Sequence, residues 1–267
     1  MFGPKAHPLF IQRFVSTSTN PFLARTRDVL ALGNATYYIQ DDTFRTRVYI
    51  YNYFRFLLDS PIPARWHMRF YGKNGRYITE RSGEMIDHDT EIVELDSIPN
   101  LDEYGVLRTY LVPAATDVFI PDPHVTMFYN EYYRPNGGAS IMGHNLHIPI
   151  ATHGTGLHQR VSPGLVVPTG FKAYLFIAGG CNFHPLGHPA CSNAFLTLVN
   201  DKGHARHVPV PSMHPLECHR LDLFAIDSGL QEHIGADPFI LKITGQGFLA
   251  KPFFIFTNGV AALGEHT

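Results

Sequence analysis

Four residues that can bind a metal lie close together in the second half of the chain. Cys181 is followed after two intervening residues by His184, and the same spacing joins His188 to Cys191. Thiolate and imidazole are the donors that tetrahedral zinc selects, and this spacing lets both members of a pair reach one ion. The stretch therefore predicts a site for zinc or another divalent metal. The competing interpretation is a proline-containing loop whose cysteines are small buried apolar residues.

Tyrosines form a second pattern with binding chemistry. Tyr49, Tyr51 and Tyr53 occupy alternate positions, so they share one face of a predicted strand. The segment 129–133 repeats this spacing with Tyr, Glu and Tyr. Rings that carry hydroxyls suit sugars, because CH groups stack on the ring while the hydroxyls find hydrogen-bond partners. The alternative is that this face is covered by a neighbouring part of the chain.

Two histidines stand in similar surroundings near the ends of the two halves. His144 follows a Met-Gly pair, and His266 follows a Gly-Glu pair. An imidazole titrates near neutral pH and can act as a ligand or a base. We therefore add both residues to the tyrosines as candidate ligand-binding residues. The alternative is a pair of half-exposed histidines that only end their strands.

The strands that would position these residues are predicted twice, once in each half of the sequence. Segment 66–76 alternates apolar and polar residues and runs into a glycine turn, and segment 194–204 does the same 128 residues later. At the same offset, 91–95 falls on 219–223, which is another alternating pair. A period this long indicates a duplicated domain rather than a solenoid.

Composition favours short strands in both copies. Gly 23 and Pro 20 predict many turns, and 45% hydrophobic residues allow a sizeable core. Predicted strands lie at 35–39, 47–53, 65–71, 91–95, 106–112 and 124–133, and at 165–167, 173–177, 194–200, 220–224, 239–243 and 253–257. The fold prediction is all-β: two tandem antiparallel β-sandwich domains of immunoglobulin-like size, from an internal duplication. The alternative is two small bicupin-like β-barrels.

The barrel alternative has a partial sequence signal. Segment 162–170 resembles the second cupin motif, but 171–174 lacks the metal-binding histidine that this motif carries after its glycine. The predicted boundaries are a leader over 1–33, the first repeat over 34–144, a linker over 145–164 and the second repeat over 165–267. Within the leader, Asn20, Pro21 and Gly33 are typical of the two ends of a short helix. A strand at 29–32 is the alternative.

The net charge, the apolar runs and the number of cysteines argue against some partners and favour one cellular compartment. A net charge of −2 with scattered cations argues against a nucleic-acid partner. No run approaches the ~18 apolar residues that predict a membrane span, and the first residues lack the basic-then-apolar pattern of a secretory signal. Three cysteines are an odd number, which favours a reducing compartment and a cytoplasmic location.

No complete catalytic motif stands in the sequence, so the functional prediction leans away from an enzyme. The first hypothesis is a non-catalytic binding or assembly protein, with no cofactor expected, whose ligand is a carbohydrate or another protein. The alternative is a metal-dependent enzyme that uses histidine ligands of the second repeat on a small polar substrate. A third hypothesis is a subunit of a homo-oligomer with the aromatic surface as its interface.

Overall fold

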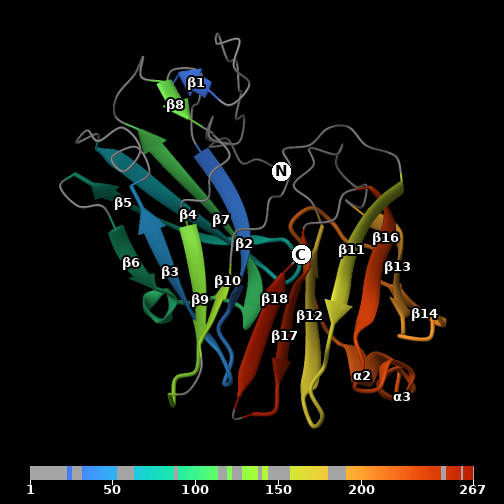
Figure 1. The fold of residues 1–267 in the computed structure, drawn as a ribbon. Coiled ribbons are helices and arrows are strands. Elements are labelled where there is room, and N and C mark those ends of the chain that lie inside the picture. The colour runs from blue at the N-terminus through green and yellow to red at the C-terminus, as the bar shows by residue number, and fades with distance from the viewer. Residues whose placement is uncertain are drawn as a thin grey trace.

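The computed structural model describes residues 23–25, 32–52, 63–86, 90–113, 119–121, 128–137, 140–143, 157–179, 191–247, 251–259 and 261–266. Within these residues the chain is almost entirely strand, so the all-β prediction is confirmed. The strands form four antiparallel sheets of four strands each, together with one two-stranded ladder (Figure 1).

The first half of the chain contributes two of the four sheets. One has the order β10-β9-β3-β6 and the other has the order β2-β7-β4-β5. Their strands are β2 (Leu32–Ile39), β3 (Arg45–Tyr51), β4 (Ala64–Gly72), β5 (Tyr77–Met85), β6 (Thr90–Glu94), β7 (Tyr104–Pro113), β9 (Phe128–Tyr133) and β10 (Ile141–Gly143). The separate ladder pairs β1 (Leu23–Arg25) with β8 (Phe119–Pro121).

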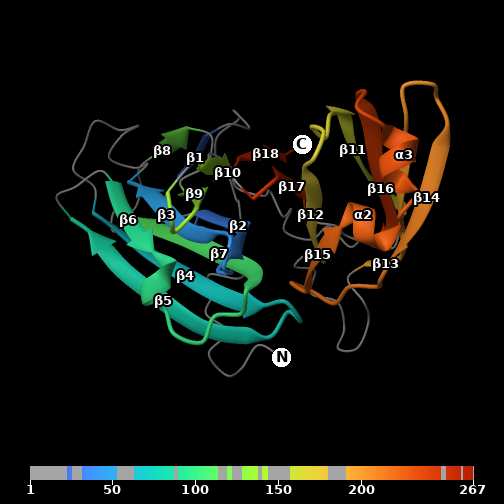
Figure 2. The same ribbon diagram turned by 90° about the horizontal axis from the view of Figure 1, so that it is seen from below.

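The second half contributes the other two sheets, ordered β18-β17-β12-β15 and β11-β16-β13-β14. Their strands are β11 (Leu157–Leu165), β12 (Lys172–Ala178), β13 (Cys191–Val199), β14 (Ala205–Val210), β15 (Cys218–Asp222), β16 (Phe239–Gly247), β17 (Phe253–Thr257) and β18 (Ala262–His266). Two short helices, α2 (Leu223–Ile226) and α3 (Leu230–Ile234), follow β15. Figure 2 shows the two layers in each half.

The two halves share one strand order. β2 to β7 correspond in sequence to β11 to β16, β9 corresponds to β17, and β10 to β18. The first strand of each half pairs with the sixth, β2 with β7 and β11 with β16, whereas the first strand of an immunoglobulin domain pairs with the second. Numbered within each half, the eight strands form one sheet of order 1-6-3-4 and one of order 8-7-2-5. A duplication as the origin of this shared order stays a prediction.

Each half has an apolar core between its own two sheets. The alternation of side chains along each strand explains this core. In β3, Val48 and Ile50 point inward, while their neighbours in the strand are more exposed. Trp66 and Phe70 of β4 meet them from the facing sheet. The second half repeats the pattern on a larger scale, with a core drawn from β12, β13, β16 and β17.

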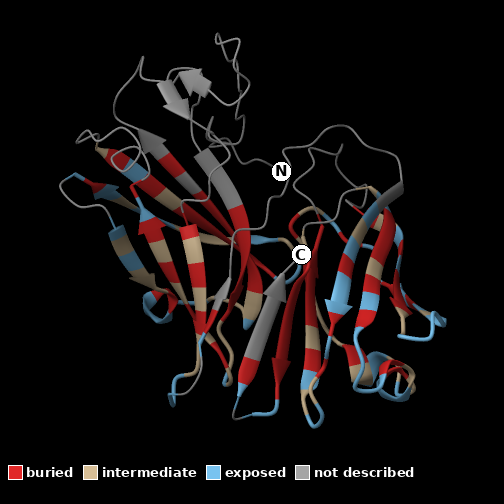
Figure 3. Cartoon of the chain, viewed as in Figure 1, coloured by how far each residue is buried: buried red, intermediate tan, exposed pale blue. Residues whose placement is uncertain are grey.

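A third apolar core lies where the two halves meet. It joins the outer face of β2 and β7 to the outer face of β12 and β17, and Figure 3 shows buried residues along these strands. Tyr132 stacks on Phe253 with ring centroids 4.8 Å apart, and the rings of Tyr37 and Phe176 are 6.0 Å apart. All four side chains are almost completely buried. The halves are therefore held together by the same kind of burial that fills each sandwich.

Polar contacts fix the register of the two halves at the edge of this core. Arg220 forms an ion pair with Asp41 of the first half, with 2.5 Å between Nη1 and Oδ2. The backbone N–H of Cys218 donates to the carbonyl of Lys73 at 2.9 Å. The turn that carries Lys73 also contains Gly75, whose backbone lies against the segment before β15. The turn between β4 and β5 is thus pressed against the second half.

Two predictions about chain organisation differ from the structure. The helix predicted within the leader is wrong at Leu23–Arg25, which is strand β1, and Leu32 already begins β2. Pairing of β1 with β8, about a hundred residues away in sequence, outweighs the local capping pattern. The stretch predicted as a linker contains β11, Leu157–Leu165, which pairs with β16. Within the residues that the structure describes, no helix is long and apolar enough to cross a lipid bilayer.

Candidate functional site

The predicted tyrosine pattern lies on the outer face of sheet β10-β9-β3-β6. Because Thr46, Val48 and Ile50 are buried, the residues between them in β3 point away from the core. The register places β6 on one side of β3 and β9 on the other. We call the resulting surface the tyrosine face, and it consists of Arg47, Tyr49, Tyr51, Ile92, Glu94, Tyr129, Glu131 and Tyr133.

A polar network occupies the centre of the tyrosine face. The hydroxyl of Tyr49 donates to Oε2 of Glu131 at 2.7 Å, and Nη1 of Arg47 lies 3.2 Å from the same oxygen. Arg47 also donates through Nε to Glu94, and its guanidinium carbon lies 4.8 Å from the centre of the Tyr133 ring. These contacts come from three neighbouring strands, so the side chains are held in place before any ligand arrives.

The network also fixes the charges of the tyrosine face. Burial by itself would raise the pKa of Glu131, but hydrogen bonds from Tyr49 and Ser140 and the guanidinium of Arg47 outweigh it, and the pKa is lowered. Burial and the acceptor Asp96 raise the pKa of Tyr133. At neutral pH the face therefore presents an ionised carboxylate beside neutral phenols.

An apolar strip lies next to the polar network. The rings of Tyr51 and Tyr129 meet edge to face, with centroids 5.4 Å apart and an angle of 89° between the planes. Tyr51 is 39% exposed, and Ile92 of the neighbouring strand is 53% exposed. The edge-to-face geometry leaves ring surface open to solvent, which is the arrangement that stacking on a flat ligand requires.

The equivalent face of the second half has a different chemistry. The cross-strand pair Tyr49–Tyr129 occupies the place of Phe176–Phe253, and Glu131 occupies the place of Ile255. Phe176, Phe253 and Ile255 are buried between the two halves. The same sheet position is therefore an apolar protein interface in one half and an open, hydrogen-bonding surface in the other.

The structure describes three of the five predicted ligand-binding residues. Tyr49 and Tyr51 lie together on the tyrosine face. Tyr53 and His144 lie outside the described residues. His266 is the last residue of β18, where its backbone pairs with Phe253. Whether the two histidines face each other stays a prediction.

Only one of the four predicted metal ligands lies within the described residues. Cys191 begins β13, belongs to the core of the second half, and exchanges backbone hydrogen bonds with Met213. Burial raises the pKa of its thiol to about 11. Cys181, His184 and His188 lie outside the described residues. Among the residues that are described, no three His, Cys, Asp or Glu side chains converge as a metal site would require, so the predicted metal site stays a prediction.

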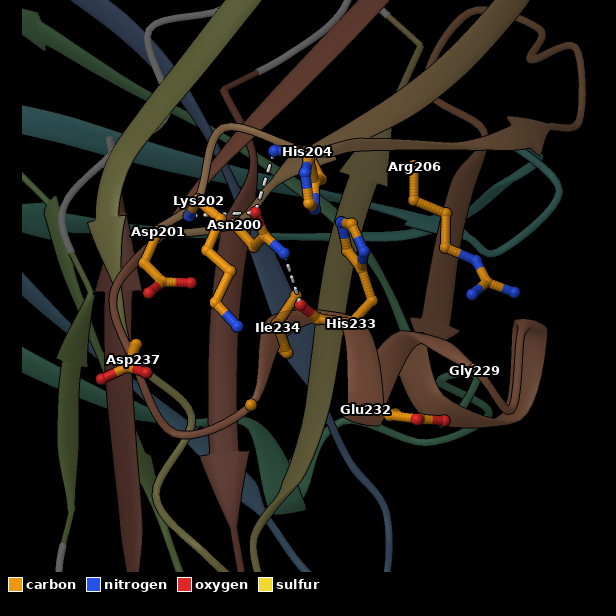
Figure 4. A pocket seen from close by; sticks show the side chains of 11 residues that line it. Asn200, Asp201, Lys202, His204, Arg206, Gly229, Glu232, His233, Ile234 and Asp237 are labelled. Carbon is orange, nitrogen blue, oxygen red and sulfur yellow. Dashed lines mark hydrogen bonds between the residues drawn. The ribbon is translucent and has the colours of Figure 1, made fainter.

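A second candidate is a polar cavity of about 480 Å³ between the β13–β14 turn and α3 (Figure 4). Asn200 holds its two walls together, because its Oδ1 accepts from the backbone N–H of His204 at 2.9 Å and its Nδ2 donates to the carbonyl of His233 at 3.1 Å. The lining also includes Asp201, Lys202, Arg206, Glu232 and Asp237. The lining mixes acidic and basic groups, whereas the polar side chains of the tyrosine face are joined by hydrogen bonds, so the tyrosine face is the better defined site.

The sequence patterns did not identify this cavity, because its residues come from segments about thirty positions apart. Comparison with known proteins finds no matching family model, no matching curated protein and no matching solved structure. Function must therefore be argued from the chemistry of the tyrosine face.

Proposed function

We propose that this chain is a non-catalytic binding protein whose tyrosine face binds carbohydrate. The observation that supports the proposal is the exposed Tyr51, packed edge to face on the half-buried Tyr129, beside the polar network around Glu131. A sugar ring has one apolar surface of CH groups and a rim of hydroxyls. The strip and the network offer the matching apolar and polar surfaces side by side.

The polar network supports specificity for neutral sugars. An ionised carboxylate accepts hydrogen bonds from sugar hydroxyls, and bonds to a charged partner are stronger than those between neutral groups. Glu131 is held by Tyr49 and Arg47, so little side-chain entropy is lost when a ligand binds. Stacking on Tyr51 adds apolar burial at about 25 cal/mol per Å² removed from water.

A protein ligand for the same face is the second candidate, but the chemistry favours it less. A large flat partner would bury the ion pair between Arg47 and Glu131, which have exposed side-chain fractions of 31% and 14%. Desolvating such a pair costs more than its attraction returns unless the partner supplies matched groups. A small polar ligand leaves water at the rim of the network.

The proposal is tested by a glycan array followed by titration calorimetry on the best ligand. Replacing Tyr51 with Ala should weaken binding at least about fivefold, since stacking on an aromatic ring contributes on the order of 1–3 kcal/mol. Tyr77→Ala is the matched control, because Tyr77 is 50% exposed on β5 of the other sheet. Equal affinity for both variants, with circular dichroism unchanged, would remove the tyrosine face from consideration.

Elemental analysis of protein purified without a histidine tag distinguishes a metal-dependent enzyme from the proposed binding protein. Stoichiometric zinc, iron or manganese, lost in a His184→Ala or His188→Ala variant, would favour an enzyme. Carbohydrate binding that is unaffected by chelator would favour the binding protein.

A further inference from the structure

The stacking ring and the open carboxylates of the tyrosine face lie at opposite ends of β3. The outward residues of this strand run from Arg45 to Tyr51, and the register sets Tyr133 beside Arg45. An extended strand rises about 3.4 Å per residue, so Tyr51 lies about 20 Å from the Arg45 end. A single sugar ring stacked on Tyr51 is too short to reach that end.

Two exposed carboxylates occupy the Arg45 end, and we call them the acidic end. The side chains of Glu94 and Asp96 are 43% and 50% exposed, whereas that of Glu131 is only 14% exposed. The hydroxyl of Tyr133 lies 3.2 Å from Oε2 of Glu94 and 3.1 Å from Oδ2 of Asp96, within reach of both acceptors. The side-chain amide of Gln40 donates to Oδ1 of Asp96 at 3.0 Å. The acidic end is therefore held in place and still has oxygen surface open to a ligand.

The segments around the acidic end belong to the described part of the chain. They are the turn at 40–44, the 3₁₀ helix Leu95–Ser97 and the turn at 134–137. With all three in place, half of the Asp96 side chain remains exposed. The guanidinium carbon of Arg47 lies 4.8 Å from the centre of the Tyr133 ring, so that side of the ring is not open to stacking. This end thus offers hydrogen-bond acceptors, and Tyr51 offers the ring.

The charges of the described side chains here select against acidic ligands. The three carboxylates of Glu94, Asp96 and Glu131 outnumber the two guanidiniums of Arg45 and Arg47. Both guanidiniums already lie beside carboxylates, Arg45 beside Asp96 and Arg47 beside Glu94 and Glu131. A carboxylate or sulfate on a ligand would meet like charge, which is strongly unfavourable in a contact. Sugar hydroxyls can donate to these acceptors without that cost.

We propose that the ligand is a linear, neutral oligosaccharide that lies along β3, with one sugar stacked on Tyr51 and a sugar further along the chain donating hydroxyls to Glu94 and Asp96. This inference rests on the proposed function, because it extends the same site. Each end by itself makes few contacts. When one oligosaccharide occupies one end, its contact with the other end becomes intramolecular, so affinity rises steeply with ligand length.

The test is titration calorimetry with linear oligomers of glucose, mannose, xylose, galactose and N-acetylglucosamine, from the monosaccharide to the hexasaccharide. In any series that binds, the hexasaccharide should bind at least about tenfold more tightly than the disaccharide, because hydrogen bonds to charged groups contribute more than those between neutral groups. A disaccharide that binds as tightly as the hexasaccharide would overturn the proposal. An acidic galacturonate hexasaccharide that binds as tightly as the neutral chains would also overturn it.

Variants at the two ends locate the ligand. Asp96→Ala should weaken hexasaccharide binding about tenfold and leave disaccharide binding unchanged, whereas Tyr51→Ala should weaken both. Asp96→Asn keeps an acceptor and should show the same dependence on length with a loss of about threefold, which covers an Ala variant that does not fold. Asp237→Ala is the matched control, because Asp237 is an exposed acid of the second half, and it should bind like the wild type.

The outcomes separate this inference from the proposed function. If Asp96→Ala binds the hexasaccharide like the wild type, or loses affinity equally for both lengths, the acidic end is not part of the site and the inference fails. Binding that is independent of length but lost in Tyr51→Ala would leave the proposed function standing alone. If none of the oligomers binds, both fail.

Discussion

Two glycines at matching positions allow the contact between the halves to be tested, because the same substitution can be compared at both. Gly75 and Gly203 lie in the turns that follow β4 and β13, with φ of 75° and 79°. Each N–H closes its turn, Gly75 onto the carbonyl of Gly72 at 2.8 Å and Gly203 onto that of Asn200 at 3.0 Å. The two turns therefore share a left-handed glycine and its closing hydrogen bond, and they differ in what surrounds that glycine.

The surroundings predict unequal costs for the same substitution. A Cβ at Gly203 would meet nothing within 4 Å, so Gly203→Ala should cost only the left-handed backbone penalty of about 1–2 kcal/mol. A Cβ at Gly75 would lie 2.6 Å from the carbonyl oxygen of Pro215 and 2.9 Å from the N of Glu217. Both atoms belong to the backbone of the second half and cannot swing aside. The forced shift adds about 1–3 kcal/mol, for a total of about 2–5 kcal/mol.

The measurement is urea denaturation of the wild type and both variants, followed by circular dichroism and by fluorescence. Trp66 is the only tryptophan and is buried in the core of the first half, so its emission reports that half. Gly75→Ala should lose at least about 1 kcal/mol more than Gly203→Ala. Equal losses would mean that the β4–β5 turn does not press on the segment before β15, and the described contact between the halves would be refuted.

Two further predictions concern the interface core and the tyrosine face. Phe176→Ala should lower the free energy of unfolding by about 3–5 kcal/mol, since Phe176 is buried between the halves. Thermal denaturation should show a single transition, and two separate transitions with only one displaced would contradict this. The lowered pKa of Glu131 contributes stability that is present above the ordinary value of 4.5 and is lost as the pH falls through the lower folded-state value. Glu131→Gln should therefore flatten the stability profile below pH 4.5 and leave its slope near neutral pH unchanged, as denaturation over a pH series would show.

Alternating strands could be predicted from the sequence where one side is buried. The prediction at 253–257 matches β17 at both ends, because this run of aromatic and β-branched residues is buried throughout. Strand β5 was missed, because Tyr77–Met85 lies at the edge of its sheet and buries only its last residue. Its sequence carries no apolar alternation to detect. Helix α3 was missed because it spans only Leu230–Ile234 between two glycines.

The candidate site could be predicted in part. Spacing alone placed Tyr49 and Tyr51 on one face, and the structure brings them to an open surface. Spacing within a strand says nothing about which strand lies beside it. The contacts from Arg47 to Glu94 and Glu131 cross two strand boundaries and depend on the register of β6 and β9 against β3. Sequence patterns do not determine that register, because it follows from how both sheets bury their cores.

A contact between two unlike faces does not close on itself. Each further domain that joins through it exposes the face to which another domain could bind. Arg47 and Glu131 stand where the other half has Tyr174 and Ile255, and burying those charges is unfavourable. The charges of the proposed ligand-binding face would thus disfavour the addition of a further module there, as the polar outer repeats of solenoid proteins do.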